Sequence, residues 1–260
     1  MRNAGYNEAM SDSLLGDLAE ILDAHGLMLR GGFHPTSADG LGPGVATVLL
    51  VGNAGPAMWQ AFSRAVPESA DPLDAWTRAT VDDVATRFGA RAAYPFDGPP
   101  YWPFQRWAMR CDDVHPSPIG VLIHPRYGPW HAYRAALLVA EPVDLPQAAR
   151  GPAPCAACTQ KPCLGACPVG AFADDGYDVP ACAAHIRSES GTACMARGCL
   201  ARHACPVGAE YRYADAQSAF HMAAFERARP ATRRTLRGAA IQMQPMETNE
   251  KARQIQKPGA

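Results

Sequence analysis

The chain has 260 residues, which is enough for one large domain or for two modest ones that each have a hydrophobic core. Hydrophobic residues make up 48% of it and charged residues 19%, and this composition excludes an intrinsically disordered protein. The formal net charge of −1 argues against nucleic acid as a partner, since proteins that bind phosphates carry a clear excess of basic residues.

Hydrophobic periodicity and turn residues predict a mixed α+β arrangement in the first half of the chain. Ser11 or Asp12 caps a first helix, and Gly26 ends it. Asp71 and Pro72 begin a longer helix, because proline suits the first helical position. In chain order we expect a helix over 11–25, a loop over 31–44, a buried strand over 46–52, a short helix over 56–65 and a long helix over 72–88.

Prolines decide the prediction for the middle of the chain. Their density over 94–118 predicts a loop, since proline interrupts both helices and strands. Two strands, over 119–124 and 133–140, flank a turn that contains glycine and proline over 125–132. Beyond them we expect a linker over 141–154, a helix over 214–228, and a partly disordered tail from Pro230 with a last turn over 236–243.

Cysteine is concentrated in one part of the sequence. Of nine cysteines, only Cys111 lies outside the stretch from Cys155 to Cys205. Residues 1–10 lack the features of a secretory signal, and no apolar run approaches the roughly 20 residues that span a bilayer. We therefore expect a cytoplasmic protein without a membrane partner, in which such a density of cysteine indicates metal binding rather than disulfides.

The eight clustered cysteines form two similar halves. Both halves end in the string Cys-Pro-Val-Gly-Ala, at 167–171 and 205–209, a degenerate internal repeat that is typical of ferredoxins with two clusters. In such proteins the cysteine before the proline ligates the opposite cluster. The spacings read Cys155-x2-Cys158-x4-Cys163-x3-Cys167-Pro168 and Cys182-x11-Cys194-x4-Cys199-x5-Cys205-Pro206.

These spacings predict two 4Fe-4S clusters with crossed ligand sets. We define the first set as Cys155, Cys158, Cys163 and Cys205. We define the second set as Cys167, Cys182, Cys194 and Cys199. Structural zinc also uses four cysteines, but the paired Cys-Pro ends favour iron–sulfur clusters.

One departure from the usual ferredoxin spacing leaves the ligands open to a swap. Four residues separate Cys158 from Cys163 and Cys194 from Cys199, where two are usual. His203 is the obvious substitute ligand in the second half, although an ordinary surface histidine is the simpler interpretation. Cys111 is left over, and we expect it to be an inert residue of the core.

The stretch 120–146, GVLIHPRYGPWHAYRAALLVAEPVDLP, resembles the cobalamin-processing proteins of the CblC type, which are decyanases and dealkylases. Weaker agreement extends over 49–62, 71–84 and 104–106. The family signature has the form G-V-x-I-H-P-R-[FY]-G-x-W-x-A-x-R, and it is matched here by Gly120, Val121, Ile123, His124, Pro125, Arg126, Tyr127, Gly128, Trp130, Ala132 and Arg134.

This resemblance implies a fold and a ligand for the first part of the chain. The fold is a nitroreductase-like antiparallel sheet with helices over 1–146, followed by a ferredoxin-like domain over 147–229 and the tail over 230–260. From the residues alone, a histidine at a strand end and nearby aromatic residues are as consistent with structural roles as with contacts to a ligand. The cobalamin contacts that the resemblance implies are Gln105, His124, Arg126, Tyr127, Gly128 and Trp130.

The predicted order of domains is similar to that of epoxyqueuosine reductase and the reductive dehalogenases. These enzymes also join a nitroreductase-like, cobalamin-binding domain to a two-cluster ferredoxin module. Their second half likewise begins with one distant cysteine, as Cys182 precedes Cys194 and Cys199 here. Two resemblances thus imply the same ligand, a corrinoid.

We therefore expect an iron–sulfur oxidoreductase that reduces cobalamin and removes its upper axial ligand, by decyanation or dealkylation, to give cob(II)alamin. Its electron donor would be of the flavodoxin or ferredoxin reductase type, and flavin binding is possible but not supported by the residues. No side chain is assigned as catalytic. The alternatives are a cobalamin chaperone or electron carrier that serves a partner, and a cobalamin-dependent reductase of an organic substrate.

Overall fold

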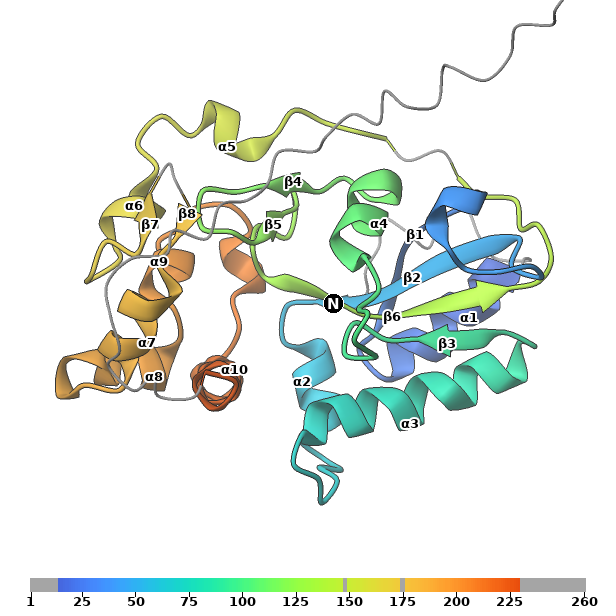
Figure 1. The fold of residues 1–260 in the computed structure, drawn as a ribbon, viewed down its shortest axis with the longest axis horizontal. Helices are drawn as coiled ribbons and strands as arrows, with labels where there is room; N and C mark the ends of the chain where they lie inside the picture. The colour runs from blue at the N-terminus through green and yellow to red at the C-terminus, as the bar shows by residue number, and fades with distance from the viewer. Residues whose placement is uncertain (1–13, 147–148, 174–175, 230–260) are drawn as a thin grey trace, which may run out of the picture. The chain divides into compact units, whose positions relative to one another are not determined.

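A four-stranded antiparallel sheet organises the first half of the chain (Figure 1). The computed structural model describes residues 14–146, 149–173 and 176–229. Strand β2 is buried along nearly its whole length, because it pairs with a neighbour on each side. In spatial order the strands are β1 (Met28–Phe33), β2 (Thr47–Ala54), β6 (His131–Val139) and β3 (Arg91–Ala93).

Helices cover both faces of this sheet, since successive residues of a strand point to opposite faces. Leu49 and Val51 of β2 pack with α1 (Leu14–Ala24) and α3 (Pro72–Arg87) in one hydrophobic cluster. Val48 and Leu50 pack with α4 (Phe104–Cys111) in the other. The short helix α2 (Ala57–Phe62) follows β2 and adds Met58 and Phe62 to the first cluster.

The α+β class and the antiparallel sheet are confirmed, as are most of the expected elements. The strand over 46–52 is β2, the helices over 56–65 and 72–88 are α2 and α3, and the strand over 133–140 is β6. The first helix is α1, which ends at Ala24. Gly26 follows with a φ of 66°, a left-handed conformation that glycine adopts readily. The expected caps of this helix, Ser11 and Asp12, lie outside the described residues, and so does the tail with its last turn over 236–243.

The loop predicted over 31–44 is wrong at its start, where β1 continues to Phe33. Gly31 lies inside this strand with a φ of +94°, and a Cβ there would lie 2.1 Å from the carbonyl oxygen of Cys111. Glycine is therefore needed for the close packing of the end of α4 on the strand, and it does not mark a loop. Within the rest of the range only a 3-10 turn forms, η1 (Ser37–Asp39).

The loop predicted over 94–118 is also wrong in part. Helix α4 begins directly after Pro103 and lies between the prolines, so none of them interrupts it. The strand expected over 119–124 shrinks to β5 (Leu122–Ile123), which pairs with β4 (His115–Pro116) and does not join the main sheet. The short edge strand β3 was not predicted.

The cysteine-bearing segment consists of short elements around a small apolar cluster. Its buried members are Ile119, Phe172 and Ala201, so little hydrophobic surface holds these elements together. The last helix confirms the prediction over 214–228, and it packs on α8. The elements are α5 (Pro154–Ala157), α6 (Pro162–Gly165), β7 (Phe172–Ala173), β8 (Gly176–Tyr177), α7 (Val179–Ile186), η2 (Glu189–Gly191), α8 (Thr192–Arg197), α9 (Leu200–His203), η3 (Ala209–Tyr211) and α10 (Asp215–Arg227).

The chain divides into two units, Met1–Ala228 and Arg229–Ala260. The sheet and the cysteine-bearing segment belong to the same unit, and a domain boundary at 146 stays a prediction. Among the helices that the structure describes, none combines the length and the apolar character needed to cross a bilayer.

Candidate metal centres and the adjoining turn

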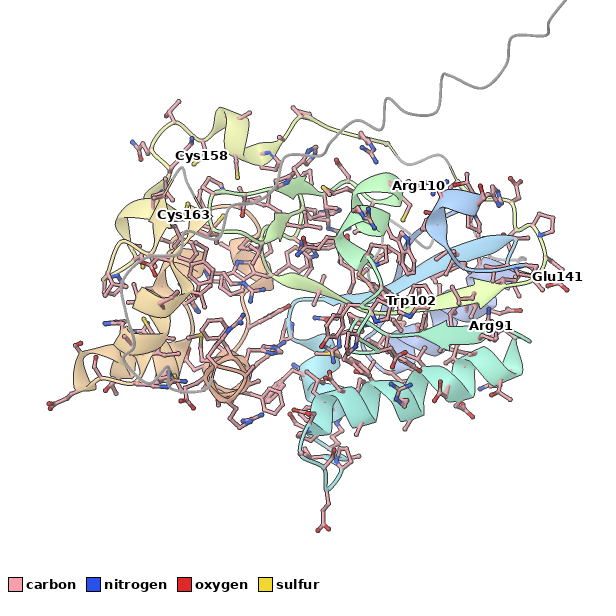
Figure 2. All side chains as sticks on the ribbon, viewed as in Figure 1. Arg91, Trp102, Arg110, Glu141, Cys158 and Cys163 are labelled. Atoms are coloured by element: carbon pink, nitrogen blue, oxygen red, sulfur yellow. The ribbon has the colours of Figure 1, made fainter. Side chains whose placement is uncertain are left out.

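The four cysteines of the first set line one small cavity, together with Lys161 and Ile123. Figure 2 shows two of them, Cys158 and Cys163, on the neighbouring turns around α5 and α6. Both short helices have a proline in their first turn. Proline suits this position because the backbone N–H that it lacks would have no helical partner there and because its fixed φ is already helical. Cys205 follows α9, near the end of the cysteine-bearing segment. It nevertheless lines the same cavity as Cys155, Cys158 and Cys163, as the crossed assignment requires.

The second set lines a larger cavity of about 280 Å³. Cys182 lies on α7 and Cys194 on α8, while Cys199 is the residue before α9. The Sγ atom of Cys167 accepts a hydrogen bond from the backbone N–H of Ala171 at 3.3 Å. Each cavity thus gathers the four cysteines that the crossed assignment groups together, while the ligation itself stays a prediction.

The thiols within each set repel one another when ionised. Burial raises the pKa of Cys155, and the neighbouring thiols of Cys205, Cys163 and Cys158 raise it further. Burial likewise raises the pKa of Cys194, with a further contribution from Cys182 and Cys167. In each case the interacting thiols belong to one set, and a metal centre would stabilise the converging thiolates.

Four thiols line each cavity, and four thiolates are the ligands that a cubane cluster takes. In the described part of the chain, no three or more side chains of His, Cys, Asp or Glu are grouped as ligands of a single ion. Four thiols placed around a cavity suit a cluster, because its iron atoms occupy separate corners and each takes one thiolate.

The polar side chains near the cysteines are not the ones that the sequence singled out. His203 lines neither cavity, and its ring packs on Trp130 with 4.9 Å between ring centroids. His185 lines the cavity of the second set, with a buried Nε2 that has no hydrogen-bond partner. The spacing Cys182-x2-His185 would have identified it, because residues i and i+3 share a helix face.

Cys111 is set apart from both cavities. It belongs to the apolar cluster between α4 and the sheet, and its thiol donates to the carbonyl oxygen of Trp107 at 3.2 Å. Burial raises its pKa to about 12, so it stays protonated and unreactive at neutral pH, as expected of an inert core residue.

The turn over 124–130 packs directly against the loop that follows Cys205. A Cβ at Gly128, where φ is +57°, would lie 1.9 Å from the carbonyl oxygen of Val207. A Cβ at Gly208, where φ is +66°, would lie 2.3 Å from the carbonyl carbon of Tyr127. Two glycines therefore allow the backbones of the turn and of the cysteine-bearing segment to touch. We call this contact the junction.

Side chains of the turn reinforce the junction. Tyr127 packs edge-on against Tyr211 with 4.9 Å between centroids, and the Nε of Arg126 donates to the Tyr211 hydroxyl at 2.8 Å. Trp130 is only 1% exposed, and it packs on Tyr213 and on His203 of the cysteine-bearing segment. The guanidinium of Arg202 donates to the carbonyl oxygen of Pro129 at 3.0 Å.

The junction divides the six predicted cobalamin contacts into two groups. Tyr127, Gly128 and Trp130 are buried within it, so they offer little surface to a large ligand. Gln105 and Arg126 are exposed, and His124 is half-buried. Contact with cobalamin stays a prediction, and the exposed residues have the surface for it.

A buried charged network, which the sequence did not reveal, lies beneath the turn. Arg30 of β1 forms an ion pair with Asp112 at 2.8 Å and lies 5.1 Å from the ring centroids of Tyr127 and Tyr133. The Tyr133 hydroxyl donates to the same oxygen, Oδ2 of Asp112, at 2.7 Å. Arg30 and Asp112 are distant in sequence, so only the fold brings them together.

His124 is held neutral by burial and by the charge of Arg30, against the opposite effect of Asp112 on its pKa. Its Nδ1 accepts hydrogen bonds from the backbone N–H groups of Arg126 at 3.0 Å and Tyr127 at 3.2 Å. The proton therefore sits on Nε2, which lies 3.7 Å from Oδ1 of Asp112. Burial and the charge of Arg30 lower the pKa of His124 to about 4, so the ring is uncharged at neutral pH.

The segment 118–123 lies between the two cavities. Its Ile119 and Val121 line the cavity of the second set, while Pro118 and Ile123 line that of the first. His124 follows directly, so one short segment forms part of both cavities and leads into the turn.

No family model matches this chain, and no curated protein matches its sequence. Solved structures of epoxyqueuosine reductase are among those distantly similar to it. Epoxyqueuosine reductase from Bacillus subtilis has a TM-score of 0.47 at 13% identity, over 76% of this chain and 66% of that one. Epoxyqueuosine reductase with a modified stem loop of tRNA-Tyr has a TM-score of 0.44 at 15% identity, over 76% of this chain and 66% of that one. The chain thus spans about two thirds of their length, and a likeness this distant carries no conclusion about activity.

Proposed function

We propose that this protein is an iron–sulfur oxidoreductase that binds cobalamin at the turn over 124–130 and reduces it. One electron added to cyanocob(III)alamin releases cyanide and leaves cob(II)alamin. An alkyl group is the other ligand that we expect to be removed, and with one electron and one proton from water it would leave as the alkane. The two clusters, when bound, supply one-electron transfer. An electron donor of the flavodoxin or ferredoxin reductase type would then reduce the oxidised cluster again.

The observation that carries this proposal is the grouping of the cysteines into two cavities, both of which adjoin the turn. Ile123 lines the cavity of the first set, and the next residue is His124. Val207, two residues after Cys205, touches Gly128. Arg202 lines the cavity of the second set and donates to the carbonyl oxygen of Pro129, so both sets lie next to the proposed cobalamin site.

The exposed residues of the turn supply hydrogen-bond donors for the amide side chains of a corrin. Arg126 is exposed, and its Nε bond to Tyr211 fixes the direction of the guanidinium while leaving further N–H groups free to donate. Gln105 at the start of α4 is also exposed. His124 orients the turn through its Nδ1, and it keeps its proton on Nε2 toward Asp112.

The first experiment is anaerobic purification followed by iron and sulfide analysis and a visible spectrum. Two cubane clusters require about eight iron atoms per chain and broad visible absorbance that bleaches on reduction. Zinc without iron would refute the proposal.

The second experiment adds cyanocobalamin to the reduced protein with an excess of reductant. Many turnovers per chain, each releasing one cyanide, support a reductase. A single stoichiometric conversion would identify a chaperone or an electron carrier, and an unchanged corrin spectrum would refute cobalamin as the ligand.

A further inference from the structure

The cavity of the second set contains a buried polar atom that the protein itself does not satisfy. His185 lies on α7 one turn beyond Cys182, and its buried Nε2 has no partner among the described residues. The same cavity is lined by all four cysteines of the set. Leaving a buried ring nitrogen without a partner is unfavourable, so a group in the cavity is expected to accept its hydrogen bond.

A second donor lies in the same cavity. Tyr177 lines this cavity together with Cys182, Cys199 and Cys167. Its ring stacks on Phe172 with 4.7 Å between centroids, which fixes the direction of the hydroxyl. Tyr177 and His185 therefore approach the second set from β8 and α7, respectively.

The cavity of the first set is lined differently. Apart from its cysteines, its described lining consists of apolar side chains, four prolines and the exposed Lys161. An ammonium in contact with water is screened, so it affects a buried charge less than a fixed hydrogen bond does. The two centres thus have different polar surroundings although both have four cysteines.

We infer that Tyr177 and His185 are hydrogen-bond donors to the thiolate-bound centre of the second set and raise its reduction potential. This inference rests on the proposed function. Reduction adds one electron and one negative charge to the centre, and both donors keep their protons and bind the reduced form more strongly. Hydrogen bonds to the sulfurs are among the features that set cluster potentials.

The test is a redox titration of the whole protein, with each cluster followed by electron paramagnetic resonance. Tyr177→Phe removes one hydroxyl and keeps the stacked ring, and His185→Phe removes the ring N–H. We expect each to reduce the equilibrium constant for reduction of the second centre about tenfold, which is about 59 mV for one electron. His185→Gln keeps a donor and should restore most of the shift.

His203→Phe is the matched control. Among the described residues the buried Nε2 of His203 also has no partner, but His203 lines neither cavity, so both potentials should stay at their original values. Full iron content with unchanged potentials in Tyr177→Phe and His185→Phe would overturn the inference and leave the proposed function intact. Loss of about four irons in His185→Phe would also overturn it, because the histidine would then be a ligand. Absence of iron in the unaltered protein would instead refute the proposed function.

Discussion

Replacing Gly128 with alanine tests whether the turn and the cysteine-bearing segment touch as closely as the structure has them. Alanine at a φ of +57° costs about 1–2 kcal/mol, because its Cβ is strained in the left-handed region. The new Cβ would also lie 1.9 Å from the carbonyl oxygen of Val207, so the backbones must separate. Forcing an extra carbon into a packed site costs a further amount of about 1–3 kcal/mol, for a total of roughly 2–5 kcal/mol.

Gly120→Ala is the matched control for this variant. Gly120 has a φ of +74°, but no atom lies within 4 Å of the position of its Cβ. It therefore incurs the conformational cost and not the steric one. The difference between the two variants isolates the cost of the contact at the junction.

The assay is urea unfolding of the purified protein, followed by circular dichroism and by tryptophan fluorescence, with the free energy of unfolding extrapolated to water. We expect Gly128→Ala to lose about 1–3 kcal/mol more than Gly120→Ala. The same variant should also slow reduction of cobalamin, because it separates the turn from the loop after Cys205. Equal losses of stability in the two variants would refute the close approach at Gly128.

Three further predictions concern the turn, the ligands and pH. Arg126→Ala should weaken cobalamin binding several-fold in a spectral titration. Arg91 is an exposed arginine that Figure 2 shows at β3, away from the labelled cysteines, so Arg91→Ala should bind cobalamin as the original protein does. Equal affinities of the two variants would exclude Arg126 from the site. Cys155→Ser should lose about four irons per chain, since one cluster loses a ligand, and Cys111→Ser should lose none; unchanged iron in the first variant would refute the assigned set. Stability should fall as the pH drops from 6.5 toward 4, because burial lowers the pKa of His124 and of His221 to about 4 and lowers that of His131 as well, and the unfolded chain takes up the protons first. Urea midpoints that are equal at pH 7 and pH 4.5 would contradict this.

Local signals in the sequence were sufficient for the elements that have apolar periodicity or a clear boundary. The alternation of Val48, Leu49 and Leu50 between the two faces makes β2 a strand that is buried on both sides. The prolines over 94–118 were misleading, because they lie before and after α4 and not within it. Gly31 was misleading for a similar reason, since its small size serves a contact with Cys111 and not a turn.

The candidate site was predictable where it depends on spacing along the chain and unpredictable where it depends on contacts across the fold. The repeated Cys-Pro strings grouped the cysteines as the two cavities do. The pairing of Arg30 with Asp112 has no local signal, because β1 and the end of α4 meet only in the folded sheet. Trp130 matched a motif for a ligand site, yet it is buried against the cysteine-bearing segment, which only the tertiary structure reveals.

The segment 118–123 gives the two cavities a common wall. Ile119 and Val121 face one cavity and Ile123 faces the other, and the chain then enters the turn at His124. A ligand that displaces this turn would therefore change the surroundings of both sets of cysteines at once, although the sets have no residue in common. If both sets hold clusters, the spectra of both would then report whether the turn is occupied.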